Sequence, residues 1–133
     1  MSIQFKIDVQ PQYVRLICQG YFNKDAALDL FDEALEIAMK HGRNAVLVDI
    51  NNLKGAPPSL LDRFYLGSSF AAIQQGKEKI VAMVVVGEEP LIDRERFGEI
   101  VATNRGAVGK VFTDDSEAVT WLESKVQQDA LPR

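Results

Sequence analysis

The stretch AVLVDI at residues 45–50 decides the fold, because it is apolar at every position except Asp49. A second stretch, IVAMVVV at residues 80–86, is apolar throughout. Strands that are apolar on both faces belong in the middle of a sheet that helices cover on both faces, or that is packed deeply on one. The two stretches therefore predict the central strands of an α/β protein.

Residues 3–9 and 14–18 precede this centre and alternate apolar with polar side chains. A period of two is typical of a strand with one buried and one solvated face. The turn between them, Gln10-Pro11-Gln12, is short and polar, which favours an antiparallel hairpin. Cys18 lies on the apolar side of the second strand and is expected to be a small core residue.

Helical spacing of apolar residues, three and four apart, recurs in the rest of the chain. It predicts helices at residues 23–41, 59–75, 92–104 and 114–126, with a short strand at 110–112. Asn23 and Ser59 stand where their side chains can cap the first turn of a helix, and we expect Asp114 with Glu117 to cap the last helix.

The resulting order is β-β-α-β-α-β-α-β-α, in which a helix follows every strand after the hairpin. Right-handed crossovers then place the later strands side by side and parallel. The expected fold class is α/β: a five-stranded mixed sheet, with an N-terminal antiparallel hairpin and then largely parallel strands, and four helices. We expect one domain over residues 1–133, with an ordered core at about 3–126 and a frayed tail at 127–133.

Composition restricts the function. With 133 residues, 47% of them hydrophobic, the chain is long and apolar enough to fold as a globular domain. A net charge of −4 removes the main attraction for nucleic acid. One Cys and one His exclude an internal disulfide and leave little for a zinc site. There is no signal-peptide pattern and no apolar run near the roughly 20 residues of a membrane span, so we expect a cytoplasmic protein without stable membrane insertion.

Ligands of open α/β sheets bind at the carboxyl ends of the parallel strands. The segments expected there are residues 49–59, 87–94 and 113–115, and Arg63 follows one helical turn after the first. Asp49 interrupts an apolar strand, so it needs partners: either the backbone of residues 51–54 or Arg63. The candidate residues for binding a partner or ligand are Asp49, Asn51, Asn52, Lys54, Ser59, Arg63 and Arg94.

Familiar catalytic patterns are missing from these segments. They contain neither His nor Cys, and the chain has no GxSxG motif, Walker loop or GxGxxG motif. Asp49, Glu88 and Asp114 could together bind Mg²⁺, although solvated loop carboxylates and helix caps explain them more simply. The sequence therefore predicts no enzymatic activity, no metal and no cofactor.

Three longer stretches carry a family resemblance: VDINNLKGAPPSLLDRF at 48–64, RFGEIVATNRG at 96–106 and VFTDDSEAVTWL at 111–122. Together with the element order, they make the chain from about Ile3 to Leu122 resemble the STAS superfamily, close to its SpoIIAA-like branch. The resemblance implies a non-catalytic regulatory domain that binds a protein partner, as anti-sigma-factor antagonists do.

In those antagonists one strand ends in an Asp, and a serine at the start of the next helix is phosphorylated to release the partner. By position, the resemblance implies that Asp49 matches this Asp and that Ser59 is the phosphoacceptor. Ser59 lies between Pro58 and Leu60, whereas the antagonist serine has a small hydroxyl residue and a glycine beside it. Plain N-capping is the alternative interpretation of Ser59.

SpoIIAA-like proteins also resemble lipid-carrying SEC14-type domains, which implies a second function, the binding of a small apolar or anionic molecule. The pocket would be lined by apolar residues near the expected mouth, which otherwise fill the core: Leu53, Ala56, Leu60, Phe64, Leu91 and Ile92. A homodimer, formed through an edge strand or an exposed helix face, is also left open.

Overall fold

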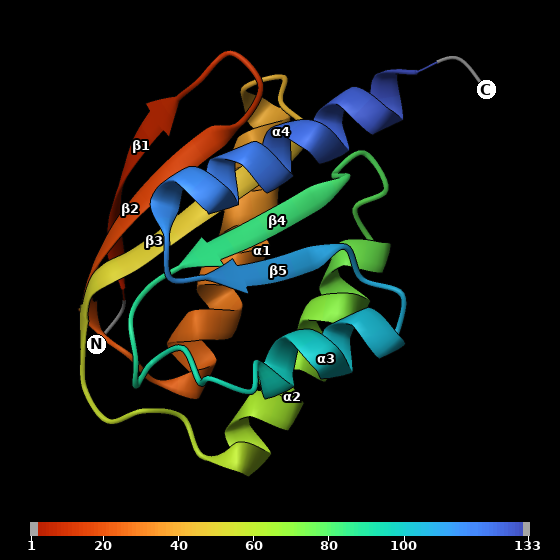
Figure 1. The fold of residues 1–133 in the computed structure, drawn as a ribbon. Coiled ribbons are helices and arrows are strands. Elements are labelled where there is room, and N and C mark those ends of the chain that lie inside the picture. The colour runs from red at the N-terminus through yellow and green to blue at the C-terminus, as the bar shows by residue number, and fades with distance from the viewer. Residues whose placement is uncertain (1–2, 132–133) are drawn as a thin grey trace.

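The computed structural model describes residues 3–131 and contains the expected five strands and four helices (Figure 1). The elements are β1 (Gln4–Val9), β2 (Val14–Tyr21), α1 (Lys24–Lys40), β3 (Ala45–Lys54), α2 (Leu60–Gln75), β4 (Ala82–Val86), α3 (Phe97–Asn104), β5 (Gly109–Phe112) and α4 (Asp115–Ala130). The fold class predicted from the sequence is confirmed.

The five strands form one mixed sheet in the order β1-β2-β3-β4-β5. β1 pairs antiparallel with β2, and all later neighbours pair in parallel. The stretches 45–50 and 80–86 supply β3 and β4 in the centre, with Val46 beside Met83 and Val48 beside Val85. Both strands are apolar on both faces because both faces are covered.

Alternation along β3 divides the core into two layers. Val46 and Val48 pack with residues of α1, α2 and α3 on one face of the sheet. Ala45 and Leu47 pack with Ala118 and Leu122 of α4 on the other face. Figure 1 shows α4 crossing in front of the sheet and α1 behind it. Neighbouring side chains of β3 therefore belong to different cores.

Two of the predicted helix caps are confirmed. The Asn23 side chain accepts a hydrogen bond from the Ala26 N–H (2.8 Å), and Ser59 Oγ accepts one from the Asp62 N–H (3.1 Å). Asp114 occupies the predicted N-cap position of α4, but its side chain makes no capping hydrogen bond and instead accepts one from Ser116 Oγ (3.1 Å). α4 also continues to Ala130, beyond the start predicted for the frayed tail, whose residues 132–133 lie outside the described part.

The predicted start of the third helix is also wrong, because α3 begins at Phe97 rather than at Ile92. Residues 92–96 form turns, and Arg96 has a left-handed backbone (φ 53°) that an α-helix does not continue through. The Asp93 carboxylate accepts a bond from the Phe97 N–H (2.9 Å), so it satisfies a free donor of the helix start.

Cys18 is fully buried in β2, as expected. Burial raises the pKa of its thiol to about 12, and the nearby Asp49 carboxylate acts in the same direction. Because the thiolate is the reactive form, this thiol is inert in the folded chain.

No helix within residues 3–131 combines the length and apolar character needed to cross a membrane.

A test of this core is the reactivity of Cys18 toward an aromatic disulfide reagent. At pH 8 we expect negligible reaction of the native protein and rapid, stoichiometric reaction in denaturing urea, where the thiol regains its ordinary pKa. Fast reaction of the native protein would contradict the burial of Cys18.

A glycine contact sets the spacing of α2 and α3. A methyl group on Gly67 of α2 would overlap the carbonyl oxygen of Gly98 in α3. Gly76, at the end of α2, has an ordinary backbone and room for a methyl group, its nearest neighbour being the Ile73 oxygen at 3.5 Å.

We predict that Gly67→Ala lowers the free energy of unfolding by about 1–3 kcal/mol, because the overlap outweighs the helix propensity gained. Gly76→Ala is the matched control and should change stability by less than about 0.5 kcal/mol. Urea denaturation of both variants measures the difference, and equal stabilities would mean that the helices are not held at this distance.

Candidate functional site

Asp49 braces the loop that follows its strand. Its Oδ1 accepts hydrogen bonds from the Asn51 backbone N–H (3.0 Å) and from Asn51 Nδ2 (2.9 Å). These bonds satisfy a carboxylate that is only 18% exposed. The structure thus supports the loop-bracing interpretation of Asp49.

Asp49 points to the α4 face of the sheet, where it meets Arg15 of β2 at 3.8 Å. The Arg15 guanidinium is held by both carboxylate oxygens of Asp115, at 2.7 and 3.0 Å. This hydrogen-bonded pair raises the pKa of Arg15 above its ordinary value. The cluster joins β2, β3 and the first turn of α4, so its charges are engaged within the fold.

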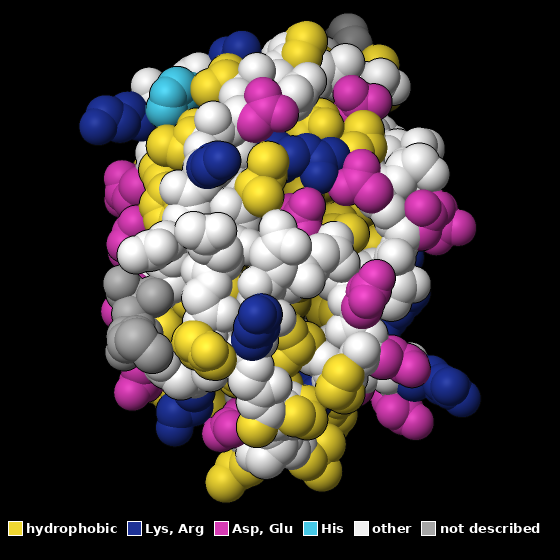
Figure 2. Space-filling model, turned by 90° about the vertical axis from the view of Figure 1, so that its left-hand side faces the viewer, with side chains coloured by type: hydrophobic (Ala, Val, Ile, Leu, Met, Phe, Trp, Pro, Cys, Tyr) yellow, Lys and Arg dark blue, Asp and Glu magenta, His cyan; other side chains and the backbone are white. Residues whose placement is uncertain are grey.

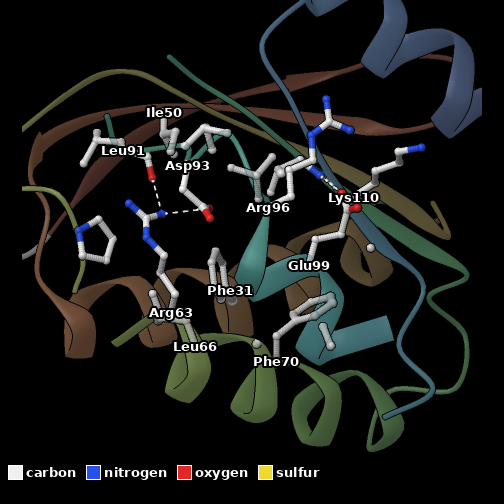
Figure 3. Close-up of a pocket in the computed structure, with 18 of the residues that line it drawn as sticks. Phe31, Ile50, Arg63, Leu66, Phe70, Leu91, Asp93, Arg96, Glu99 and Lys110 are labelled. Atoms are coloured by element: carbon white, nitrogen blue, oxygen red, sulfur yellow. Dashed lines mark hydrogen bonds and ion pairs between the residues drawn. The ribbon is translucent and has the colours of Figure 1, made fainter. Parts of the chain in front are cut away.

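The alternative pairing of Asp49 with Arg63 does not occur, because the two side chains lie on opposite sides of the sheet. Arg63 projects from α2 beneath the 88–96 loop (Figure 3). Its Nη1 donates to the Leu91 carbonyl (2.9 Å) and to Asp93 Oδ1 (3.1 Å), and its Nη2 donates to the Pro90 carbonyl (3.0 Å). Arg63 therefore fastens the loop to α2.

The other predicted residues lie at the surface. Asn51, Asn52 and Lys54 are exposed along the last part of β3, and the Lys54 carbonyl accepts a bond from the Phe22 N–H (2.8 Å). Ser59 is exposed at the start of α2 with its hydroxyl in the capping bond. The Arg94 side chain is 84% exposed and makes one long contact, 3.5 Å, with Glu89.

Apolar side chains gather on the outer face of the first turns of α2. Leu60, Leu61, Phe64 and Tyr65 are 67%, 77%, 42% and 44% exposed, and together they are called the α2 patch here. Figure 2 shows hydrophobic atoms gathered at the end of the molecule where α2 begins. Exposing such side chains to water is unfavourable, so a contiguous row of them is a candidate contact surface.

Two cations border the α2 patch. The Lys24 ammonium lies 4.9 Å from the centre of the Tyr65 ring, and the Arg105 guanidinium lies 5.2 Å from that of Phe64. These cation–π contacts place positive charge at the border of the patch. Sequence reasoning selected the polar residues near this helix and missed Leu61 and Tyr65. The available signal was that Leu61 and Tyr65 share a helix face with Leu60 and Phe64, away from the face that carries the buried Phe70.

A cavity of about 130 Å³ lies between α2, α3 and the sheet. Gly67 and Gly98 meet at its wall, and Figure 3 shows Phe31, Leu66 and Phe70 on one side with Ile50 and Leu91 on the other. Of the six residues predicted to line a pocket, Leu91 and Ile92 do so, whereas Leu60 and Phe64 point to solvent.

Few of the charged groups that line this cavity are directed at its centre. Arg63 and Asp93 are paired with each other, and Glu99 Oε1 accepts a bond from the Val111 N–H (2.8 Å). Arg96 and Lys110 turn away from the centre of the cavity in Figure 3, and both lie over the Phe112 ring. The cavity is therefore apolar in character, because its lining charges are either paired or turned away from its centre.

Within residues 3–131, no three His, Cys, Asp or Glu side chains are grouped as they would be around a metal ion. Asp49, Glu88 and Asp114, which the sequence brought together as a Mg²⁺ alternative, do not form such a group.

No family model and no curated protein matches this sequence. Among solved structures, an anti-sigma factor antagonist from Mycobacterium paratuberculosis is similar, with a TM-score of 0.57 and 14% identity over 92% of this chain and 95% of that one. An uncharacterised protein with a SpoIIAA-like fold from Shewanella loihica PV-4 has a TM-score of 0.50 and 22% identity over 91% of this chain and 93% of its own. This chain has the SpoIIAA-like fold.

The resemblance inferred from the residues is thus confirmed in fold. In this SpoIIAA-like chain the loop after β3 leads into α2, and the loop after β4 is bonded to α2 through Arg63. Ser59 and the α2 patch face solvent, whereas Arg63 faces inward. The geometry separates residues that hold the loops from residues free to contact another molecule.

The role of Arg63 can be tested by Arg63→Lys. Lysine keeps the charge but lacks the planar guanidinium that bonds three acceptors at once. We expect a loss of about 1–3 kcal/mol in stability and faster amide exchange in residues 88–96. Arg94→Ala, in the same loop but exposed, should change neither quantity. Unchanged exchange in Arg63→Lys would show that the loop is held by other contacts.

Proposed function

We propose that this chain is a non-catalytic, cytoplasmic regulatory module that binds another protein through the α2 patch and the adjoining 54–59 loop. The observation that carries the proposal is the row of four exposed apolar side chains on the first turns of one helix. The name of the similar Mycobacterium paratuberculosis structure, an anti-sigma factor antagonist, supports the choice of a protein partner.

The chemistry of the surface defines the partner. Leucine and aromatic side chains require an apolar counterpart that buries them, since burial of each large side chain contributes about 1.5–3 kcal/mol. Lys24 and Arg105 lie at the border of the α2 patch, so acidic groups on the rim of the partner would be favoured. Asp49 and Arg63 make no contact with the partner in this proposal, because they are engaged in holding loops within the fold.

Ser59 is proposed as the switch. Its hydroxyl is exposed at the N-terminus of α2, where a phosphate would meet free backbone N–H groups and the positive end of the helix dipole. The added charge would lie next to Leu60 and oppose the docking of an apolar partner surface. Phosphorylation therefore releases the partner in this proposal.

The proposal is tested by placing a photo-crosslinking amino acid at Leu61 in the source cells and, as a control, at Val108, which is 38% exposed near the far end of α2. A specific adduct should form from position 61 only. The purified adduct partner should then bind Leu61→Glu at least about tenfold more weakly than wild type or Val108→Glu.

The phosphorylation switch has its own variants. Ser59→Glu should weaken the same partner, whereas Ser59→Asn, which also caps a helix, should bind like the wild type. Equal binding by Leu61→Glu and wild type would refute the surface. Equal binding by Ser59→Glu alone would refute only the switch.

A further inference from the structure

The two edges of the sheet differ. At β5, Glu99 Oε1 accepts a hydrogen bond from the outward N–H of Val111, and α3 lies alongside, so this edge is blocked. At β1, no described element lies beyond the strand (Figure 1), and Figure 2, which looks at this edge, shows it facing solvent. An open edge strand is a template for pairing with another strand.

The unused backbone groups of β1 can be assigned from its register with β2. Gln10 donates to the Tyr13 carbonyl (2.8 Å), and Asp8 and Lys6 lie opposite Arg15 and Ile17. Because bonding direction alternates along an antiparallel strand, the even residues point to β2. The N–H and C=O groups of Phe5, Ile7 and Val9 therefore point outward.

The side chains of β1 complement a second copy of the same strand. Ile7 and Val9 are 45% and 41% exposed on one face, and Lys6 and Asp8 are exposed on the other. We propose that β1 pairs antiparallel with β1 of a second copy of this chain, with Ile7 opposite Ile7. Phe5 then faces Val9, and Lys6 faces Asp8 at two symmetrical positions.

Charge selects this register. The outward N–H and C=O groups stay paired only if the second strand shifts by two residues. A shift of two residues in one direction places Lys6 opposite Lys6, and in the other direction it places Asp8 opposite Asp8. Like charges directly opposite are destabilising, whereas opposite charges stabilise cross-strand pairs. In the proposed register Lys6 and Asp8 form non-hydrogen-bonded pairs, where side chains approach most closely.

The test is sedimentation equilibrium from about 1 µM to about 1 mM protein, a range that covers weak and moderate self-association. Wild type should dimerise, and Lys6→Asp and Asp8→Lys should each raise the dimer Kd by about tenfold. The double exchange should restore it. Ile7→Pro removes an N–H that points away from β2, so the chain should still fold, but it should no longer dimerise. Leu61→Glu, on the α2 patch, is the control and should dimerise normally.

Disulfide cross-linking of variants with one added cysteine tests the register independently. Hydrogen-bonded antiparallel pairs have Cα atoms about 5.5 Å apart, a separation that a disulfide accepts. Ile7→Cys should therefore oxidise to a covalent dimer much faster than Lys6→Cys or Asp8→Cys, while buried Cys18 does not react. A wild type that is monomeric at every concentration overturns the proposal. The proposal is also overturned if Ile7→Pro leaves the dimer Kd unchanged, or if cross-linking is fastest at position 6 or 8.

Discussion

The burial of β3 and β4 on both faces is the constraint on which the rest of the structure depends. Val46 and Val48 need a cover on one side, and Ala45 and Leu47 need one on the other, so helices must pack on both faces of the sheet. Alternation then sends Asp49 to the α4 side, where Arg15 and Asp115 engage it. The opposite side is covered by α1, α2 and α3, and α2 presents its first turns to solvent.

Most of the fold follows from local patterns, because period two, helical period and capping residues act within a few positions. The hairpin, the central strands and the caps at Asn23 and Ser59 were predicted for this reason. The start of α3 was not, since it depends on Asp93, which Arg63 binds from 30 residues away along the chain. The cavity depends likewise on the meeting of Gly67 and Gly98, which no periodicity in either helix reveals.

The sequence and the structure point to different residues for the candidate site. Polar residues near strand ends were chosen, yet Asp49 and Arg63 turn out to serve the fold, and Asp49 could have been separated from Arg63 by the alternation along β3. The exposed apolar residues of α2 carry the proposed function. Their exposure could not be known before α3 was placed, because a leucine on a helix is buried or exposed according to what packs beside it.

In the proposed function, the α4 side of β3 maintains the structure, whereas the α2 side contacts the partner. Calorimetric titration of the captured partner into Asp49→Asn, with unfolding followed in parallel, separates these two roles most directly. We expect reduced stability but an unchanged partner Kd, because Asp49 only braces the loop. A folded Asp49→Asn variant that no longer binds would contradict it.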